Sequence, residues 1–393
     1  MKETWRWFGE LDRIELSEIR QTGATGIVTA LHEIPYGEVW ERQTIAARRD
    51  QIRAAGLEWT VCESLPIHED IKRGAGNLGL LFANYRQSLA NLAAEGVHTI
   101  CYNFMPILDW TRTDLEAPVT SGGSCLRFSA PRMAAFEIHM LGRKEAENDF
   151  PVDVLNKARA WYDASSSTDQ TELLKAIMSG LPGAYDRYDI TGLRRALETY
   201  HGMDADDIRS NYRRFLDEVI PAAEDLNMRL CVHPDDPPRD ILGLPRIVSD
   251  NDDIAWIMSA NDSHANGLTL CTGSLGANPD NDLAKIARRF ADRVHFAHLR
   301  NVRKDPDGSF EEAAHLEGDV DMVSLCRIIL DEERSRQSNG RPDWQIPFRP
   351  DHGHQLLSDG DKKTFPGYPL VGRLRGLAEI RGVVHALDRV PAV

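Results

Sequence analysis

The sequence predicts a single α/β barrel in which eight parallel strands alternate with helices. Eight short apolar runs recur along the 393 residues, and segments with helical patterns, such as 38–55 and 85–95, separate the early runs. Strand–helix–strand units with right-handed crossovers build a parallel sheet, and eight such units can close it into a (β/α)8 barrel. A doubly wound open sheet is less favoured, because no glycine-rich dinucleotide loop follows an early strand.

The predicted strands are short runs rich in β-branched, aromatic and other apolar side chains. In chain order they are 5–8 (WRWF), 26–31 (GIVTAL), 57–63 (LEWTVCE), 99–104 (TICYNF), 228–233 (MRLCVH), 268–271 (LTLC), 294–298 (VHFAH) and 346–348 (IPF). The first run contains two tryptophans close to the N-terminus, so it could alternatively cap the bottom of the barrel.

We expect residues 1–393 to form one barrel domain that carries a helical insertion between the fourth and fifth strands. The interval 110–220 is rich in charged residues and helix formers and is too long for a plain connection. Unstructured loops longer than about 12–15 residues are uncommon in compact domains unless they serve a function. The insertion could be a lid or a subunit contact, and we expect a homo-oligomer. It could equally be a solvated elaboration with no chemical role.

Composition excludes several classes of partner. The formal net charge of -15 argues against nucleic acid or an anionic membrane, and an anionic substrate would need local positive charge in its site. The chain has no apolar run of about 18 residues and no signal-peptide pattern at its start. The six cysteines are scattered without a CxxC pair, which is typical of reduced thiols. We therefore expect a cytoplasmic protein that acts on a small molecule.

Polar side chains fall at the ends of the last four predicted strands. Side chains alternate between the two faces of a strand, so His233, Cys271 and His298 lie opposite their aliphatic neighbours and face the barrel interior. Asp351 joins them if the last strand stays regular past Pro350. Because active sites of such barrels lie at the C-terminal ends of the strands, these four side chains should converge.

The four side chains form a donor set that suits a divalent first-row metal ion. Two imidazoles, a thiolate and a carboxylate mix borderline-soft and hard ligands. Four protein ligands in octahedral coordination leave two positions for water or substrate, which favours Mn²⁺ or Fe²⁺ over a closed tetrahedral zinc site. Taken singly, a buried cysteine is more often a small apolar side chain, and a lone histidine is more often hydrogen-bonded in the core. Their coincidence at adjacent strand ends favours the metal site.

Long literal stretches around these strand ends match the signature segments of one known family. They include 102–106 (YNFMP), 109–114 (DWTRTD), 233–238 (HPDDPP), 271–274 (CTGS), 298–300 (HLR), 315–321 (HLEGDVD), 349–354 (RPDHGH) and 366–368 (PGY). With these segments the chain resembles the mannonate dehydratase family nearly end to end, and the match is weakest over about 115–203.

The resemblance implies a xylose-isomerase-like TIM barrel that removes water from D-mannonate to give 2-keto-3-deoxy-D-gluconate, in hexuronate breakdown. It implies Mn²⁺ or Fe²⁺ as the cofactor. The metal ligands that it implies are His233, Cys271, His298 and Asp351. It also implies His352 and Tyr368 as the acid–base pair.

Four further residues are predicted to bind the substrate. Arg300 lies on the ligand-bearing face of the seventh strand and could hold an oxygen of the substrate carboxylate. His68, Asn103 and Arg112 lie at or after the ends of the third and fourth strands, where they could contact a hydroxyl or carboxylate. Each of these three also has an ordinary surface or helix-capping role as an alternative.

The residues alone leave two other functions open. A metal-dependent aldose–ketose isomerase could use the same barrel, although such enzymes usually need a carboxylate-rich pair of metal sites, and this ligand set has one carboxylate. A barrel with a structural ion and a partner-binding insertion would not be an enzyme. The sequence also leaves open which of His352 and Tyr368 is the acid, and whether manganese or iron is bound.

Overall fold

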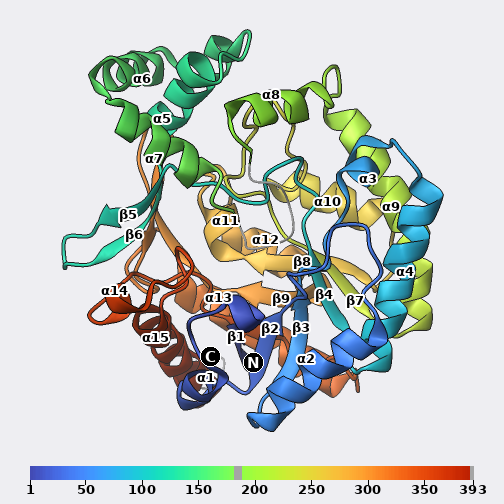
Figure 1. Cartoon of the computed structure of the whole chain (residues 1–393). Coiled ribbons are helices and arrows are strands. Elements are labelled where there is room, and N and C mark those ends of the chain that lie inside the picture. The colour runs from blue at the N-terminus through green and yellow to red at the C-terminus, as the bar shows by residue number, and fades with distance from the viewer. Residues whose placement is uncertain (181–187, 390–393) are drawn as a thin grey trace.

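Eight parallel strands close into a barrel in the computed structural model, which describes residues 1–180 and 188–389 (Figure 1). The order around the barrel is β1-β12-β9-β8-β7-β4-β3-β2. The strands are β1 (Lys2–Arg6), β2 (Gly26–Thr29), β3 (Glu58–Glu63), β4 (Thr99–Tyr102), β7 (Arg229–Val232), β8 (Asn266–Cys271), β9 (Val294–His298) and β12 (Pro347–Arg349). Each overlaps a predicted strand, so the predicted barrel is confirmed, and the first run joins the sheet.

Helices follow the strands and surround the barrel (Figure 1). They are α1 (Leu16–Gln21), α2 (Arg42–Ala54), α3 (Glu69–Arg73), α4 (Leu78–Ala94), α9 (Ala205–Asp225), α10 (Asn251–Ala260), α11 (Thr272–Gly276), α12 (Leu283–Arg289), α13 (Met322–Ser338), α14 (Asp359–Lys362) and α15 (Leu370–Arg389), with short 3-10 turns at η1 (Gly9–Leu11) and η4 (Ala291–Arg293). Among the helices of the described ranges, none combines the length and apolar character that a membrane crossing requires.

The crossover helix α9 shows how the sequence produces these elements. The carboxylate of Asp204 accepts hydrogen bonds from two backbone N–H groups of the first turn, which satisfies donors that a helix start leaves unpaired. Ile208, Phe215 and Val219 recur at helical spacing and are fully buried. This apolar face therefore fixes α9 against the barrel.

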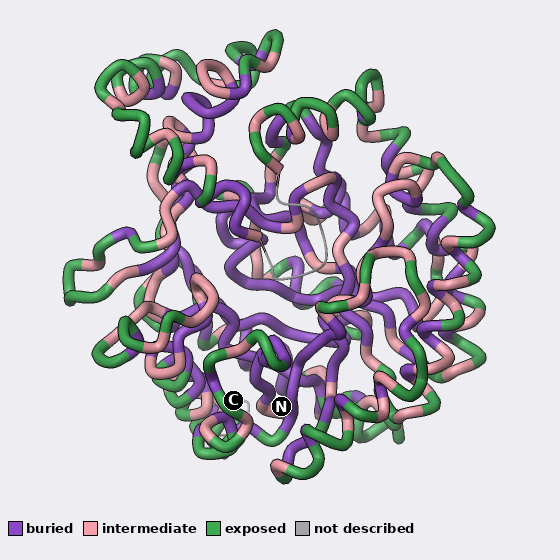
Figure 2. The backbone as a smooth tube through the Cα atoms, viewed as in Figure 1, coloured by how far each residue is buried: buried purple, intermediate pink, exposed green. Residues whose placement is uncertain are grey.

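Successive side chains of a strand point to opposite faces, so the apolar side chains of the barrel strands form two separate regions, as the sequence analysis predicted. Leu230 and Val232 belong to the large core that includes residues of the surrounding helices. Cys231, Cys101 and Phe296 belong to a separate small cluster, formed by side chains from the other face of the strands. Figure 2 shows the strands as a continuous buried centre inside a partly exposed ring of helices. The polar strand ends thus stand on top of a packed interior.

The interval between β4 and β7 contains the predicted helices and also two strands that the sequence did not predict. The helical elements are α5 (Ala130–Ala135), the π-helical turn η2 (Phe136–Met140), the 3-10 turn η3 (Ala146–Asp149), α6 (Val152–Ala164), α7 (Ser167–Ile177) and α8 (Ile190–Glu198). Part of the predicted insertion, residues 181–187, lies outside the described residues.

The two additional strands, β5 (Asp114–Pro118) and β6 (Ser124–Phe128), form a hairpin at one side of the barrel (Figure 1). They continue through β11 (Phe310–Ala313) to β10 (Asn301–Lys304) in an antiparallel sheet of order β10-β11-β6-β5. Most residues of β5 are at least partly exposed, so this strand is not an apolar run and escaped the pattern used for the barrel. The small sheet matters because β11 reaches the candidate site.

The buried position of Leu230 predicts a large loss of stability on truncation. We expect Leu230→Ala to lower the free energy of unfolding by about 2–5 kcal/mol, because it leaves a cavity between β7 and the surrounding helices. Leu80→Ala, at a position of α4 that is 54% exposed, should change it by less than about 0.5 kcal/mol. Urea unfolding followed by circular dichroism measures both variants, and equal losses would contradict the placement of Leu230.

Candidate metal centre and active site

The C-terminal ends of β7, β8 and β9 bring His233, Cys271 and His298 together. One donor atom from each lies within 4.8 Å of the donors from the other two. His233 Nε2 is 3.1 Å from His298 Nδ1. Cys271 and His298 are direct neighbours across the β8–β9 ladder, so strand pairing fixes their relative position. The convergence predicted from strand parity is therefore present for these three side chains.

Asp351 reaches the same place by a different route from the one predicted. Strand β12 ends at Arg349, and Asp351 has a φ of 62°, so the regular strand does not continue past Pro350. Asp351 Oδ2 nevertheless lies 3.7 Å from Cys271 Sγ. The left-handed conformation, which aspartate tolerates better than most residues, turns the carboxylate toward the other three groups.

The protonation states of these groups fit a divalent cation. Burial lowers the pKa of His233, so its imidazole stays neutral and keeps a lone pair for a metal. Burial alone would raise the pKa of the Asp351 carboxyl, but Arg349, with His352 and His298, holds that pKa well below its usual range. His298 Nδ1 is the nitrogen that faces His233, since Nε2 lies 3.4 Å from Glu63 Oε2. Neutral imidazoles and an ionised carboxylate are the ligand forms that metal ions bind.

Arg349 connects this group to a residue that the sequence analysis missed. Its Nε and Nη2 atoms donate to Glu63, at 3.0 and 2.7 Å, and its Nη1 donates to Asp351 Oδ1. All three side chains are nearly fully buried. Glu63 ends β3 as Arg349 ends β12, so the rule that identified the histidines at strand ends would have identified this pair as well.

A second buried charge network lies beside the first. Arg112 donates to both oxygens of Asp236, at 2.7 and 2.9 Å, and to Glu312 Oε1 at 2.9 Å. Arg300 Nη2 donates to Asp236 Oδ2 at 2.8 Å. Burial alone would raise the pKa of Asp236, but Arg112 and Arg300 hold it well below its ordinary value. Glu312, opposite Arg300 and His352, has a pKa lowered to about 2. Mutual compensation of this kind is what lets charges remain buried.

His352 and Tyr368 form a contact pair within this environment. His352 Nε2 is 3.3 Å from the Tyr368 hydroxyl, and the two rings meet edge to face. On the other side of the imidazole, His352 Nδ1 lies 3.0 Å from Glu312 Oε1 and 3.0 Å from Arg300 Nη1. Burial raises the pKa of Tyr368, which therefore stays protonated. The pair offers a nitrogen base beside a hydroxyl donor.

The structure brings two of the four predicted substrate-binding residues into the pocket of this centre. Asn103 and Arg300 line it together with His233, Asp351, His352 and Tyr368. Arg112 is fully buried behind the pocket wall and bonded to Asp236 and Glu312. His68 caps α3 by accepting a hydrogen bond from Asp70 N, and it lines a different small pocket. Direct substrate contact by Arg112 or His68 stays a prediction that the structure does not support.

The sequence analysis missed several other residues of this pocket. Glu63, Met105, Asp109, Trp110, Asp236 and Arg349 also line it. Asp236 follows the end of β7 within a segment already noted, 233–238, so its position next to His233 was the available signal. Glu312 offered no such signal, because its short strand belongs to the small sheet and contains two glutamates, so it is not an apolar run.

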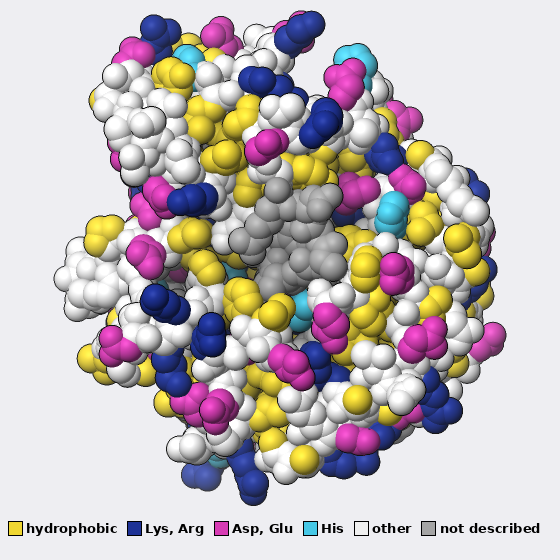
Figure 3. Space-filling model, in the orientation of Figure 1, with side chains coloured by type: hydrophobic (Ala, Val, Ile, Leu, Met, Phe, Trp, Pro, Cys, Tyr) yellow, Lys and Arg dark blue, Asp and Glu magenta, His cyan; other side chains and the backbone are white. Residues whose placement is uncertain are grey.

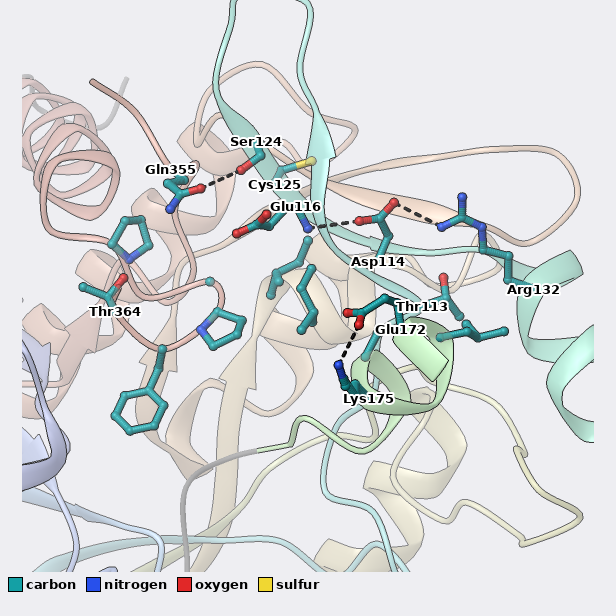
Figure 4. A pocket seen from close by; sticks show the side chains of 18 of the residues that line it. Thr113, Asp114, Glu116, Ser124, Cys125, Arg132, Glu172, Lys175, Gln355 and Thr364 are labelled. Carbon is teal, nitrogen blue, oxygen red and sulfur yellow. Dashed lines mark hydrogen bonds and ion pairs between the residues drawn. The ribbon is translucent and has the colours of Figure 1, made fainter. Parts of the chain in front are cut away.

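A larger cavity of about 500 Å³ opens beside the centre, between the β5–β6 hairpin, α7 and residues 353–369 (Figure 4). Its lining includes Gly353 and Gly367, which neighbour His352 and Tyr368 in sequence. The ion pairs drawn in Figure 4, Asp114 with Arg132 and Glu172 with Lys175, use side chains of the insertion. The cavity contains none of the converging donor atoms, so the smaller pocket is the candidate site.

Comparisons with known proteins agree with this geometry. A family model described as D-mannonate dehydratase (UxuA) matches residues 1–392. The mannonate dehydratase of Chromohalobacter salexigens is 51% identical over 391 residues, which are 99% of this chain and 100% of the relative. The mannonate dehydratase of a Marinomonas species is 50% identical over 98% of each chain.

Solved structures give the same result. The crystal structure of mannonate dehydratase from Streptococcus suis serotype 2 has a TM-score of 0.77 at 32% identity, over 99% of this chain and 94% of that one. A D-psicose 3-epimerase from Clostridium cellulolyticum H10 has a TM-score of 0.52 at 11% identity, over 98% of this chain and 99% of that one, and shows a shared fold alone. The resemblance seen in the sequence is confirmed, and the chain belongs to the mannonate dehydratase family.

Proposed function

We propose that the protein is a metal-dependent hydro-lyase that removes water from D-mannonate to give 2-keto-3-deoxy-D-gluconate, in hexuronate breakdown. One observation carries the proposal: His233, Asp351 and the imidazole–phenol pair line a single pocket, and Cys271 and His298 lie directly against these two ligands. Membership of the mannonate dehydratase family supports the substrate. The converging ligand group contains a single carboxylate, that of Asp351, which argues against the two-metal arrangement typical of an aldose–ketose isomerase.

We propose Mn²⁺ or Fe²⁺ as the ion, held by His233, Cys271, His298 and Asp351. When bound, such an ion would act as a Lewis acid that offsets the negative charge developing beside the substrate carboxylate. Arg349 binds Oδ1 of Asp351, which leaves Oδ2 on the side of Cys271. Arg349 therefore orients the carboxylate for a metal, in the way that partners of metal ligands commonly do.

His352 is the proposed base and Tyr368 the proposed acid. Glu312 Oε1 can accept a hydrogen bond from a protonated Nδ1 of His352, and this tautomer leaves the lone pair on Nε2, toward Tyr368. His352 Nε2 takes the C2 proton, the electron pair of the C–H bond forms the C2–C3 double bond, and the C3–O bond breaks. Tyr368 protonates the departing hydroxide, and the resulting enol becomes the 2-keto product. At 3.3 Å, His352 can then return its proton to Tyr368.

Arg300 favours the opposite tautomer of His352. Its Nη1 atom is as close to Nδ1 as Glu312 is, and a guanidinium can only donate. If Arg300 determined the tautomer, Nε2 would carry the proton and could not act as the base. Substitution of Glu312 distinguishes the two arrangements.

We further propose a cytoplasmic homo-oligomer in which residues 1–393 form one barrel domain with an insertion. On the face shown in Figure 3, acidic and basic side chains are interspersed and no broad basic patch appears among the described residues. The formal charge of -15 agrees with a small-molecule substrate, without nucleic acid or a membrane as partner. The turn of the β5–β6 hairpin and most of β5 are exposed or half-buried, so this part of the hairpin is a candidate subunit contact.

A product assay tests the proposed function directly. The purified protein, loaded in turn with Mn²⁺, Fe²⁺ and Zn²⁺, is incubated with D-mannonate, D-fructuronate or free aldoses, and 2-keto-3-deoxy acid is measured. We expect product from D-mannonate with Mn²⁺ or Fe²⁺ and none after chelation. Conversion of an aldose alone would favour the isomerase, and no conversion of any compound would favour a non-catalytic binding protein.

The proposed ligands predict the behaviour of two variants. Cys271→Ser and His233→Ala should lose most bound metal and all metal-dependent turnover, because each removes a ligand. Metal content is measured by atomic spectrometry on the folded protein. Cys326→Ser, at another buried cysteine on α13, is the matched control and should retain its metal. Full metal occupancy with normal turnover in both ligand variants would exclude this ligand set.

The proposed base predicts a loss of rate without a loss of metal. His352→Asn should retain the ion but lower kcat by about 100-fold or more, since general base catalysis contributes about 10²–10⁴-fold. Glu312→Gln should lower kcat by at least about tenfold with little change in KM, because an amide can no longer hold the proton of Nδ1 as a carboxylate does. An unchanged rate in Glu312→Gln would assign the tautomer to Arg300 instead.

A further inference from the structure

The end of β1 carries a buried arginine whose N–H groups are incompletely satisfied. Arg6 is 1% exposed and is the last residue of β1, so it lies at the same end of the barrel as the metal-ligand group. Its Nε and Nη1 atoms have no hydrogen-bond partner among the described residues. Nη1 is 3.9 Å from Glu63 Oε2, and Nη2 is 3.5 Å from His32 Nε2. Arg246 also has two unpaired buried donors, but Arg6 in addition lines a cavity, so its unpaired donors can meet a ligand.

Glu63 does not satisfy Arg6, because its nearest oxygen is 3.9 Å from Nη1, beyond hydrogen-bond distance, and its carboxylate is held by Arg349. Both of its oxygens accept hydrogen bonds from Arg349, at 3.0 and 2.7 Å. The guanidinium of Arg6 instead lies over the ring of Phe8, 4.8 Å from its centroid, and this contact leaves the N–H groups at the edge of the guanidinium plane available. Arg6 is thus held in place by packing, with donors to spare.

The cavity that Arg6 lines adjoins the proposed active site. Asp109 lines both this cavity and the pocket of the metal-ligand group. Ser64, in the lining of the first, directly follows Glu63, in the lining of the second. The two spaces therefore meet at Asp109 and at the end of β3. A molecule that extends away from the metal-ligand group in this direction would reach Arg6.

We infer that this cavity, with a free volume of about 20 Å³, is a subsite for the far end of the polyhydroxylated tail of the substrate, and that Arg6 recognises that end. The inference rests on the proposed function, in which carbons 1–3 of a six-carbon sugar acid react at the metal-ligand group. Carbons 4–6 then carry three hydroxyls that need partners. The N–H groups of Arg6 can donate to hydroxyl oxygens, and the carboxylate of Asp109 can accept from hydroxyl hydrogens.

Tail binding at Arg6 is also connected to the proposed acid. Phe8, beneath the guanidinium of Arg6, packs edge to face against Tyr368 with ring centroids 4.8 Å apart. A tail bound to Arg6 would therefore hold this side of the pocket in the arrangement that positions the Tyr368 hydroxyl. Remote contacts of this kind are a common way in which binding energy aligns reacting groups.

Two substrates of different length test the inference. D-mannonate is compared with a four-carbon trihydroxy acid that has the same configuration at C2 and C3 but lacks C5 and C6. We expect Arg6→Gln to lower kcat/KM for D-mannonate by about 10–100-fold, as the loss of hydrogen bonds to a charged group does. The same variant should change kcat/KM for the shorter acid by less than about threefold, because that acid does not reach the subsite. If the shorter acid turns over too slowly, its inhibition constant takes the place of kcat/KM.

Further variants separate recognition from structural damage. Arg6→Lys keeps a donor and a charge, so it should recover part of the D-mannonate activity. Asp109→Asn should also affect the longer acid more than the shorter one. Arg336→Gln, which removes another buried arginine, near the start of β9, is the matched control and should leave the ratio of the two acids unchanged. Metal content is measured in parallel and should stay constant in all four.

Equal losses for the two acids in Arg6→Gln, or no loss for either, would overturn the subsite. Failure of the wild-type protein to dehydrate D-mannonate would instead refute the proposed function. The two failures are therefore distinguishable. If Arg6→Gln does not fold, Arg6→Lys and Asp109→Asn decide the question by the same ratio.

Discussion

Arg349 occupies the position on which the geometry of the candidate site depends. It is fully buried at the end of the last barrel strand and binds Glu63 of β3 on one side and Asp351 on the other. Removing a guanidinium from water is costly, and the cost is recovered only if its hydrogen bonds are met by well-placed carboxylates. Closure of the barrel supplies them, because β12 and β3 then lie near one another across the top of the interior. The same contacts that stabilise the buried charge also orient a proposed metal ligand.

The charges at this end of the barrel are balanced before any ion or substrate is considered. Four buried arginines and four buried carboxylates surround the pocket, namely Arg6, Arg112, Arg300, Arg349, Glu63, Asp236, Glu312 and Asp351. A metal-bound thiolate at Cys271 and a divalent ion would add one negative and two positive charges, which places positive charge beside the donors while the Asp109 carboxylate at the pocket wall balances the sum. A protein with a formal charge of -15 can thereby bind an anionic sugar acid, since the local field rather than the net charge governs binding within the site.

The sequence predicted the parts of the site that follow from strand periodicity. His233, Cys271 and His298 end regular strands, so alternation and the common direction of the strands were enough to bring them together. Asp351 was predicted from a regular strand, but its left-handed backbone conformation is what turns its carboxylate to the others. Glu312 could not be predicted, because its position depends on pairing between β11 and β6, about 180 residues apart in sequence, and no local pattern encodes that pairing. The substrate itself came from the family resemblance and not from any single residue.

The two halves of the chain contribute different groups to the candidate site. The proposed metal ligands and the acid–base pair follow β7, β8, β9 and β12, all in the second half. Arg6 ends β1, and Asn103 and Asp109 follow β4; all three lie in the first half and are proposed to contact substrate. Because the order around the barrel places β1 beside β12 and β4 beside β7, the halves meet at two seams, and the pocket lies above both. Variation in the first half could therefore change which sugar acid is accepted while the metal-binding half stays fixed. The barrel allows this arrangement because the hydrogen bonds of each strand position the end of that strand.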